Sequence, residues 1–226
     1  MSGEGRDSST GTRVVLRPLA TPLPLGFLAL SLATTMFSAL QLGWIDPDQG
    51  RVVAYTALFA AAPLQLLAAV FGFLTRDPVA ATGMGILAGT WAVAGLTTLT
   101  SPPGATSQGL GVLLCVAGTA MLVPAAAAVS SKIAPAVVMA LTGTRFVVTG
   151  VYEVTASAPW KTAAGWVGVA LAVFAVYTAL ALELEGAREK TVLPLGRRGP
   201  GRIAMAGDGA LDAADLAREA GVRPQL

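Results

Sequence analysis

The sequence predicts an all-α integral membrane protein with six transmembrane helices and both termini in the cytoplasm. Its 226 residues are 54% hydrophobic and only 12% charged, whereas soluble domains carry about 25% charged residues. The charged residues fall in short polar breaks between long runs that carry no charge. A run of about 20 apolar residues is long enough, at roughly 1.5 Å per residue, to cross a hydrocarbon core of about 30 Å.

The first span lies within Leu19–Ile45, which has no charge between Arg17 and Asp46. Pro22 and Pro24 open it, and proline is tolerated in the first turn of a helix because the N–H it lacks would be unpaired there. Residues 1–17 before it are small, polar and of mixed charge, so we expect a disordered N-terminal tail rather than a signal peptide.

The other spans follow from the breaks between them. Residues 78–131 carry no charge, which is too long for one span, and the segment Thr100–Gly109 has a loop-forming composition that divides them. Pro63 and Pro124 are expected to kink their helices. We predict helices at residues 52–75, 79–99, 110–129, 133–154 and 162–184. The membrane domain is then 18–184, and residues 185–226 form a mostly disordered cytoplasmic tail with, as an alternative, a short helix at 211–220.

Orientation follows from the lysine and arginine residues in the loops. With the N-terminus inside, twelve of them lie in the inner segments and only Arg51 and Lys161 in the outer ones. This asymmetry places both termini in the cytoplasm and predicts a multi-pass protein of the cell (plasma or inner) membrane.

Composition also excludes several kinds of chemistry. The chain has no histidine and a single cysteine, Cys115, so we expect no metal site, no cofactor and no intrachain disulfide. No phosphate-binding loop, activated nucleophile or pair of buried carboxylates is present, so an enzyme is not expected. The basic residues sit at membrane edges, which argues against nucleic acid as a partner.

Small residues at four-residue spacing indicate close helix packing. Gly85 and Gly89 share one face of the third span, and Ala164, Gly168 and Ala172 share one face of the last. Such faces let helix backbones approach closely in a membrane.

Arg145 is the sharpest functional candidate, because it lies in the middle of the fifth span. A charge near the bilayer centre costs at least about 2.5–3.5 kcal/mol, so it is expected to face the protein interior. Facing a pore, it would attract an anion; the alternative is a structural arginine held by carbonyl groups or by a neighbouring helix. Glu153, two turns away, is an imperfect partner and a candidate proton carrier. Thr34 and Gln65 are further polar candidates, although structural packing explains each of them singly.

Three separated stretches carry a resemblance to a known family. The first is Pro22-Leu23-Pro24-Leu25-Gly26-Phe27, with Thr34 and Gly43 further along the same span. The second is Gln65 with Trp91. The third comprises Gly165-Trp166-x-Gly168, then Ala175 and Tyr177, and finally Thr191-Val192-Leu193-Pro194-Leu195-Gly196. Together they resemble the acetate uptake transporter family (acetate/succinate-proton symporters), which includes bacterial acetate permeases and fungal acetate and ammonia-export proteins.

The resemblance implies a six-helix protomer that assembles into a ring-shaped hexamer, each protomer having its own pore for small monocarboxylates. The family's pore narrows at a Phe, a Tyr and a Leu. Matched positions here are Leu30, Leu87 and Thr142, or Leu141 if the register slips by one. A position that limits substrate size corresponds to Ala175.

This sequence departs from the family pattern at several of these positions. The signature Asn before Pro22 is Thr21, the collar has lost its aromatic rings, and Arg145 replaces an apolar residue. We therefore expect a transporter or channel for small carboxylates, acetate-like with succinate as an option, linked to protons. A leucine collar beside an arginine would suit a larger or more charged anion such as a dicarboxylate. The alternative is a non-transporting structural or sensory membrane protein whose tail binds a partner.

Overall fold

A computed structural model describes residues 19–188 and 190–199, and this part of the chain is helical, apart from turns and one isolated β-bridge. Six of its segments are long and apolar enough to cross a membrane, which confirms the predicted number of spans. The helices are α1 (Leu23–Leu42), η1 (Pro47–Gln49), α2 (Gly50–Tyr55), η2 (Thr56–Ala61), α3 (Ala62–Leu74), α4 (Pro78–Thr100), α5 (Gln108–Ala120), α6 (Leu122–Val129), α7 (Ile133–Thr155) and α8 (Ala158–Arg188).

Capping residues in the polar breaks set where several helices begin and end. The carboxylate of Asp77 accepts hydrogen bonds of 3.0 Å from the backbone N–H groups of Val79 and Ala80, at the start of α4. At the end of α1, Gly43 adopts φ +71°, a left-handed conformation that costs glycine little. The last helix is longer than the predicted 162–184: its 31 residues span about 46 Å, so it extends beyond a core of about 30 Å.

Both predicted proline distortions have counterparts in the backbone. Pro63 follows the π-helical segment η2, and Pro124 follows the interruption at Met121 that separates α5 from α6. Proline cannot donate to the carbonyl four residues earlier, so the preceding turn must change its hydrogen bonding. The second span is therefore η1, α2, η2 and α3, and the fourth is α5 and α6.

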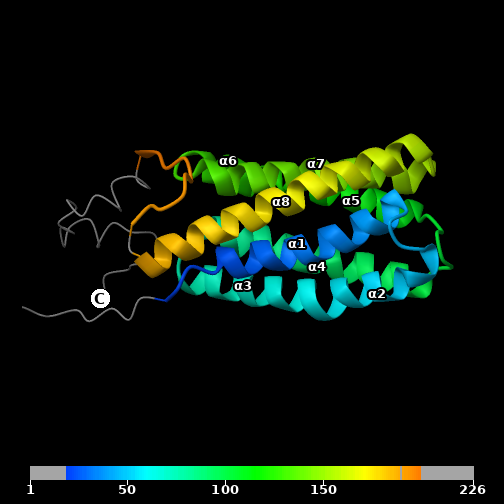
Figure 1. The fold of residues 1–226 in the computed structure, drawn as a ribbon, viewed down its shortest axis with the longest axis horizontal. Helices are drawn as coiled ribbons and strands as arrows, with labels where there is room; N and C mark the ends of the chain where they lie inside the picture. Colours follow the sequence, from blue (N-terminus) through cyan, green and yellow to red (C-terminus); the bar gives the residue numbers. More distant parts are fainter. Residues whose placement is uncertain (1–18, 189, 200–226) are drawn as a thin grey trace, which may run out of the picture.

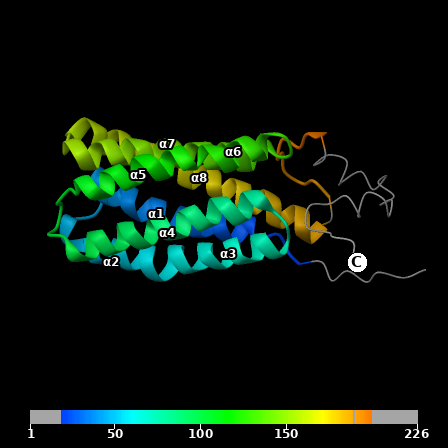
Figure 2. The ribbon, with the colours of Figure 1, turned by 180° about the vertical axis from the view of Figure 1, so that it is seen from behind.

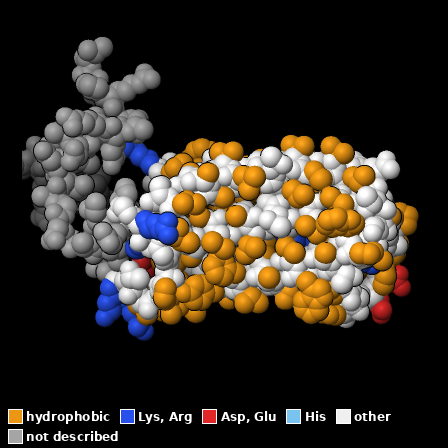
Figure 3. Space-filling model, turned by 90° about the horizontal axis from the view of Figure 1, so that it is seen from above, with side chains coloured by type: hydrophobic (Ala, Val, Ile, Leu, Met, Phe, Trp, Pro, Cys, Tyr) orange, Lys and Arg blue, Asp and Glu red, His pale blue; other side chains and the backbone are white. Residues whose placement is uncertain are grey.

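The spans pack side by side as an elongated bundle (Figures 1 and 2). The most extensive contacts join α1 with α8, α5 with α7, and α3 with α4. Leu19 and residues 190–199 lie at one end, here called the terminal end, and the loops 43–46, 101–107 and 156–157 lie at the other, the far end. In Figure 3 charged side chains gather at the two ends of the bundle, while hydrophobic atoms cover much of the middle.

Two glycine pairs bring α5 and α7 into backbone contact. A Cβ atom on Gly143 would lie 2.6 Å from the carbonyl oxygen of Gly118, and one on Gly150 would lie 2.6 Å from that of Gly111. Each helix thus carries its two contact glycines seven residues apart. Of the predicted packing pair Gly85 and Gly89, a Cβ on Gly85 would contact Ala69 at 3.9 Å, whereas one on Gly89 would have no neighbour within 4 Å in the protomer.

Residues 190–199, here called the strap, fold back against the terminal end of the bundle. The carbonyls of Gly196 and Leu195 accept hydrogen bonds of 3.2 and 3.1 Å from the N–H groups of Ile133 and Ala134, which open α7. Leu195 is only 1% exposed. The strap therefore caps a helix whose N-cap side chain makes no such bond.

A charged cluster holds the strap to α8. The guanidinium of Arg197 makes a two-pronged ion pair with Glu185, whose Oε2 also accepts a 3.2 Å hydrogen bond from Thr191. Burial, reinforced by Arg197, lowers the pKa of Lys132, and Glu185 opposes this effect. The prediction for residues 211–220 lies outside the described residues.

Candidate functional site

Arg145 on α7 is buried, with only 2% of its surface exposed. Its Nη1 donates a 2.5 Å hydrogen bond to Thr149 Oγ1, and its Nη2 donates a 2.5 Å hydrogen bond to Gln41 Oε1 on α1. Within the described part of the chain, Arg145 has no recorded ion pair. Neutral acceptors alone therefore hold a cation that would be costly to keep in a membrane.

Glu153, the predicted proton carrier, lies on the same helix nearer the far end. Its carboxylate accepts a 2.8 Å hydrogen bond from the backbone N–H of Ser107, in the loop before α5. That contact ties the loop to α7. Its carboxylate is thus engaged by the loop and has no recorded ion pair with Arg145.

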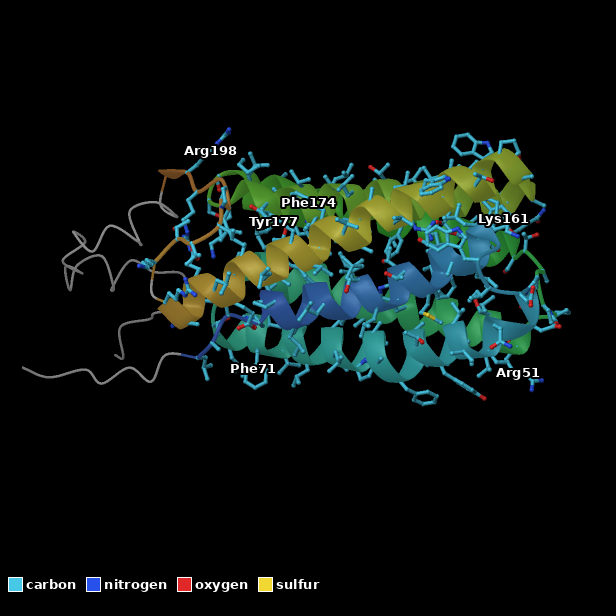
Figure 4. All side chains as sticks on the ribbon, in the orientation of Figure 1. Arg51, Phe71, Lys161, Phe174, Tyr177 and Arg198 are labelled. Atoms are coloured by element: carbon cyan, nitrogen blue, oxygen red, sulfur yellow. The ribbon has the colours of Figure 1, made fainter. Side chains whose placement is uncertain are left out.

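Two adjoining cavities lead inward from the far end. The outer one, of about 170 Å³, lies among the far-end loops and is bordered by Arg51 and Lys161, both labelled in Figure 4, and by Asp48. The inner one, of about 40 Å³, reaches Arg145. Residues that line both cavities are Phe37, Gln41, Thr98, Leu110 and Glu153.

Among the described residues, several buried polar atoms lack hydrogen-bond partners, and two of them belong to residues that line the inner cavity, Trp91 and Arg145. Buried polar side-chain atoms with no hydrogen-bond partner, among the described residues, are Thr34 Oγ1, Ser38 Oγ, Gln65 Oε1, Trp91 Nε1 and Arg145 Nε. A buried polar atom without a partner costs roughly 1–3 kcal/mol, so five in one small bundle call for a functional explanation.

The predicted collar residues are completely buried. Leu30, Leu87 and Ala175 belong to one apolar cluster, and each is 0% exposed. Thr142 is also 0% exposed, and its hydroxyl donates a 2.7 Å hydrogen bond to the carbonyl oxygen of Val138 on its own helix. The bundle is therefore closed at this level.

The signature residues of the first span have structural roles at the start of α1. Pro22 is the N-cap, Pro24 lies in the first turn, and Leu25 is 36% exposed. Gly26 lies so close to Met84 on α4 that a Cβ atom would collide with its side chain. The carbonyl of Gly26 also accepts a 3.3 Å hydrogen bond from Gln65 Nε2, so this turn joins α1 to α3.

The sequence analysis did not identify Ser38 and Gln41 as site residues, and it did not predict that Gly168 lies against Arg145. A signal was present, because Thr34, Ser38 and Gln41 recur at the spacing of one helix face. The close approach of Gly168 to Arg145 could not be seen in the sequence: a Cβ on this α8 glycine would lie 2.6 Å from Arg145 Nε and would collide with Ser38 Oγ.

Comparisons with known proteins identify a family and a similar solved structure. Residues 5–194 match the GPR1/FUN34/yaaH family. The structure is similar to the solved structure of the bacterial acetate channel SatP. The TM-score is 0.70 and the sequence identity 23%, and the match covers 79% of this chain and 100% of that one. None of the curated proteins compared with the chain is significantly similar in sequence.

Proposed function

The chain belongs to the GPR1/FUN34/yaaH family, and on that premise we propose that it is a membrane transporter or channel for small carboxylate anions. The resemblance of its fold to a bacterial acetate channel supports acetate as the reference substrate. The observation that carries the proposal is the pair of adjoining cavities that lead from the far end to Arg145, a buried arginine that makes no ion pair with any of the described residues.

The far-end rim itself carries both signs of charge, since Arg51 and Lys161 are accompanied by Asp48 and Glu153. Attraction of an anion is therefore assigned to Arg145 rather than to the rim. Beyond it, the apolar level of Leu30 and Leu87 imposes a dehydration barrier, and apolar constrictions of this kind can gate by excluding water. The path opens when these side chains separate.

Proton linkage is part of the proposal. In the absence of histidine, the proton is carried either by Glu153 or by the protonated acid itself. The proposal also includes a hexameric assembly in the cell membrane, as the family resemblance implies, with both termini in the cytoplasm.

A second candidate function is a non-transporting structural or sensory membrane protein. The observation that favours it is the complete burial of Leu30, Leu87 and Thr142 across the bundle. In that case the cavity at the far end would be a blind pocket, and the tail would bind a partner.

Uptake of labelled acetate and succinate into liposomes that contain the purified protein separates the two candidates. We expect uptake that saturates, that unlabelled acetate inhibits, and that an inward proton gradient accelerates. Liposomes without protein give the background, and size-exclusion and thermal unfolding profiles establish that the reconstituted protein is folded. Uptake equal to background by folded protein would rule out the transport proposal and leave the structural one.

A further inference from the structure

The inner cavity is bordered by an arginine and by an aromatic wall that includes a tryptophan. Phe37, Trp91 and Phe146 border it, with ring centroids 5.4 Å apart for Phe37 and Trp91 and 5.7 Å apart for Trp91 and Phe146. The Nε1 atom of Trp91 is buried and has no hydrogen-bond partner. Arg145, its two acceptors Gln41 and Thr149, and the acidic residue Glu153 also border the cavity.

The N–H groups of Arg145 and Trp91 outnumber the hydrogen bonds that the described residues accept from them. A guanidinium has five N–H groups, and two recorded hydrogen bonds, to Gln41 and Thr149, engage one on each terminal nitrogen. The indole of Trp91 adds another N–H. A carboxylate is the complementary group, because its two oxygens can accept a pair of parallel N–H bonds from a guanidinium.

We propose that Arg145 and Trp91 form a carboxylate-binding site in the inner cavity, and that the aromatic wall together with Glu153 restricts this site to short anions with a single charge. This inference rests on the proposed function and adds to it the residues that hold and select the anion. It also reverses the expectation that an arginine beside a leucine collar would favour a dicarboxylate.

The selection follows from size and charge. A cavity of about 40 Å³ holds about three water-sized groups at roughly 10–15 Å³ each, which suits an anion as small as acetate. The longer succinate would have to place its second carboxylate against aromatic rings or near Glu153, which also borders the cavity. An unpaired buried charge and a like-charge neighbour are both unfavourable.

Gly168 on α8 is a positioning residue for this site. A Cβ atom there would lie 2.6 Å from Nε and 3.1 Å from Cζ of Arg145. The guanidinium therefore occupies space that only glycine leaves free. Gly165, one turn earlier on α8, offers a matched control, because the atoms nearest to a Cβ there would belong to the side chain of Leu42, 2.5 Å away, and not to Arg145.

Isothermal titration of the purified, folded protein in detergent tests the site without requiring transport. Sodium acetate and sodium succinate are titrated at pH 7.5 and equal ionic strength, where both acids are ionised. We expect acetate to bind one site per chain and succinate to bind at least about tenfold more weakly, a difference of about 1.4 kcal/mol.

Variants then assign the residues. Arg145→Gln and Gly168→Ala should each weaken acetate binding at least about tenfold. Trp91→Phe, which keeps an aromatic ring but removes the indole N–H, should also weaken it. Gly165→Ala should leave acetate binding unchanged. Glu153→Gln should strengthen succinate binding relative to acetate. Should Arg145→Gln fail to fold, Arg145→Lys keeps the charge, loses the forked donors and is expected to weaken acetate binding as well.

Three results would overturn the inference: no acetate binding by folded wild-type protein, acetate binding that is unchanged in both Arg145→Gln and Gly168→Ala, or succinate binding as tight as that of acetate. These results are separable from the test of transport. Acetate uptake without dependence on Arg145 would refute the site and keep the function. Binding with the expected variant effects but without uptake would keep the site and refute the function.

Discussion

Individual apolar side chains form the barrier in the proposed path. Leu87 is the best of them to test, because it is completely buried at the level of the predicted collar. We predict that Leu87→Ala increases the rate of acetate uptake, since it removes part of the apolar barrier. A Leu→Ala change in a packed core also lowers the free energy of unfolding by about 2–5 kcal/mol, so the thermal unfolding midpoint of this variant should fall.

Leu171→Ala on α8 provides the control for this prediction. Leu171 is also 0% exposed and belongs to the same apolar cluster, but it is not a predicted collar position. It should lose a similar amount of stability without any gain in uptake. Equal uptake by the two variants would show that Leu87 does not limit the path.

At the scale of helices, the contact between α5 and α7 depends on glycine. Gly143→Ala would place a methyl group 2.6 Å from a backbone oxygen, so the helices must separate, at a cost of about 1–3 kcal/mol. We predict a lower thermal midpoint for Gly143→Ala. Gly89→Ala is the matched control, because a Cβ there would have open space around it and alanine stabilises a helix by about 0.8–1.0 kcal/mol relative to glycine. Equal thermal midpoints for the two variants would show that the contact between α5 and α7 does not depend on glycine at this position.

The strap is a second element whose contribution can be measured. Glu185→Gln removes the charge from the carboxylate that binds Arg197, and hydrogen bonds to charged groups contribute about 1.5–3 kcal/mol. We predict that this variant lowers the thermal midpoint and exposes the strap to protease. Glu183→Gln, two residues earlier and exposed, should change neither; equal behaviour of the two variants would contradict a role for the ion pair.

For the molecule as a whole, the orientation prediction rests on the charge of the loops. In a Cys115→Ser background, Ala105→Cys at the far end and Ser130→Cys at the terminal end are both exposed. A membrane-impermeant maleimide applied to intact cells should label Ala105→Cys directly and Ser130→Cys only after permeabilisation. The reverse pattern would place both ends of the chain outside.

The sequence was sufficient to predict the number of spans and their positions along the chain, but only part of the candidate site. Charge-free runs and breaks such as Asp77 locate six helices to within a few residues, because the hydrocarbon core imposes a minimum length. The rotation of each helix is not determined in this way, since a helix that is apolar on all sides has no distinct polar face. Arg145 could therefore be singled out, whereas its bond to Gln41 depends on how α1 and α7 face each other.

The packing of the strap against the bundle could not be predicted for a related reason. Residues 190–199 mix apolar side chains such as Val192 and Leu195 with basic ones, and nothing in this pattern shows that the carbonyls of the segment complete the first turn of α7. Long-range capping of this kind leaves no periodic signal.

The glycine pairs between α5 and α7 also bear on how such a protein can diverge. Gly111, Gly118, Gly143 and Gly150 join two backbones without any side chain that could be exchanged, so these positions should tolerate almost no variation in a saturation screen. Collar and cavity side chains, by contrast, can change without altering that joint. A lineage could thus keep its scaffold constant while the side chains that line its cavities change.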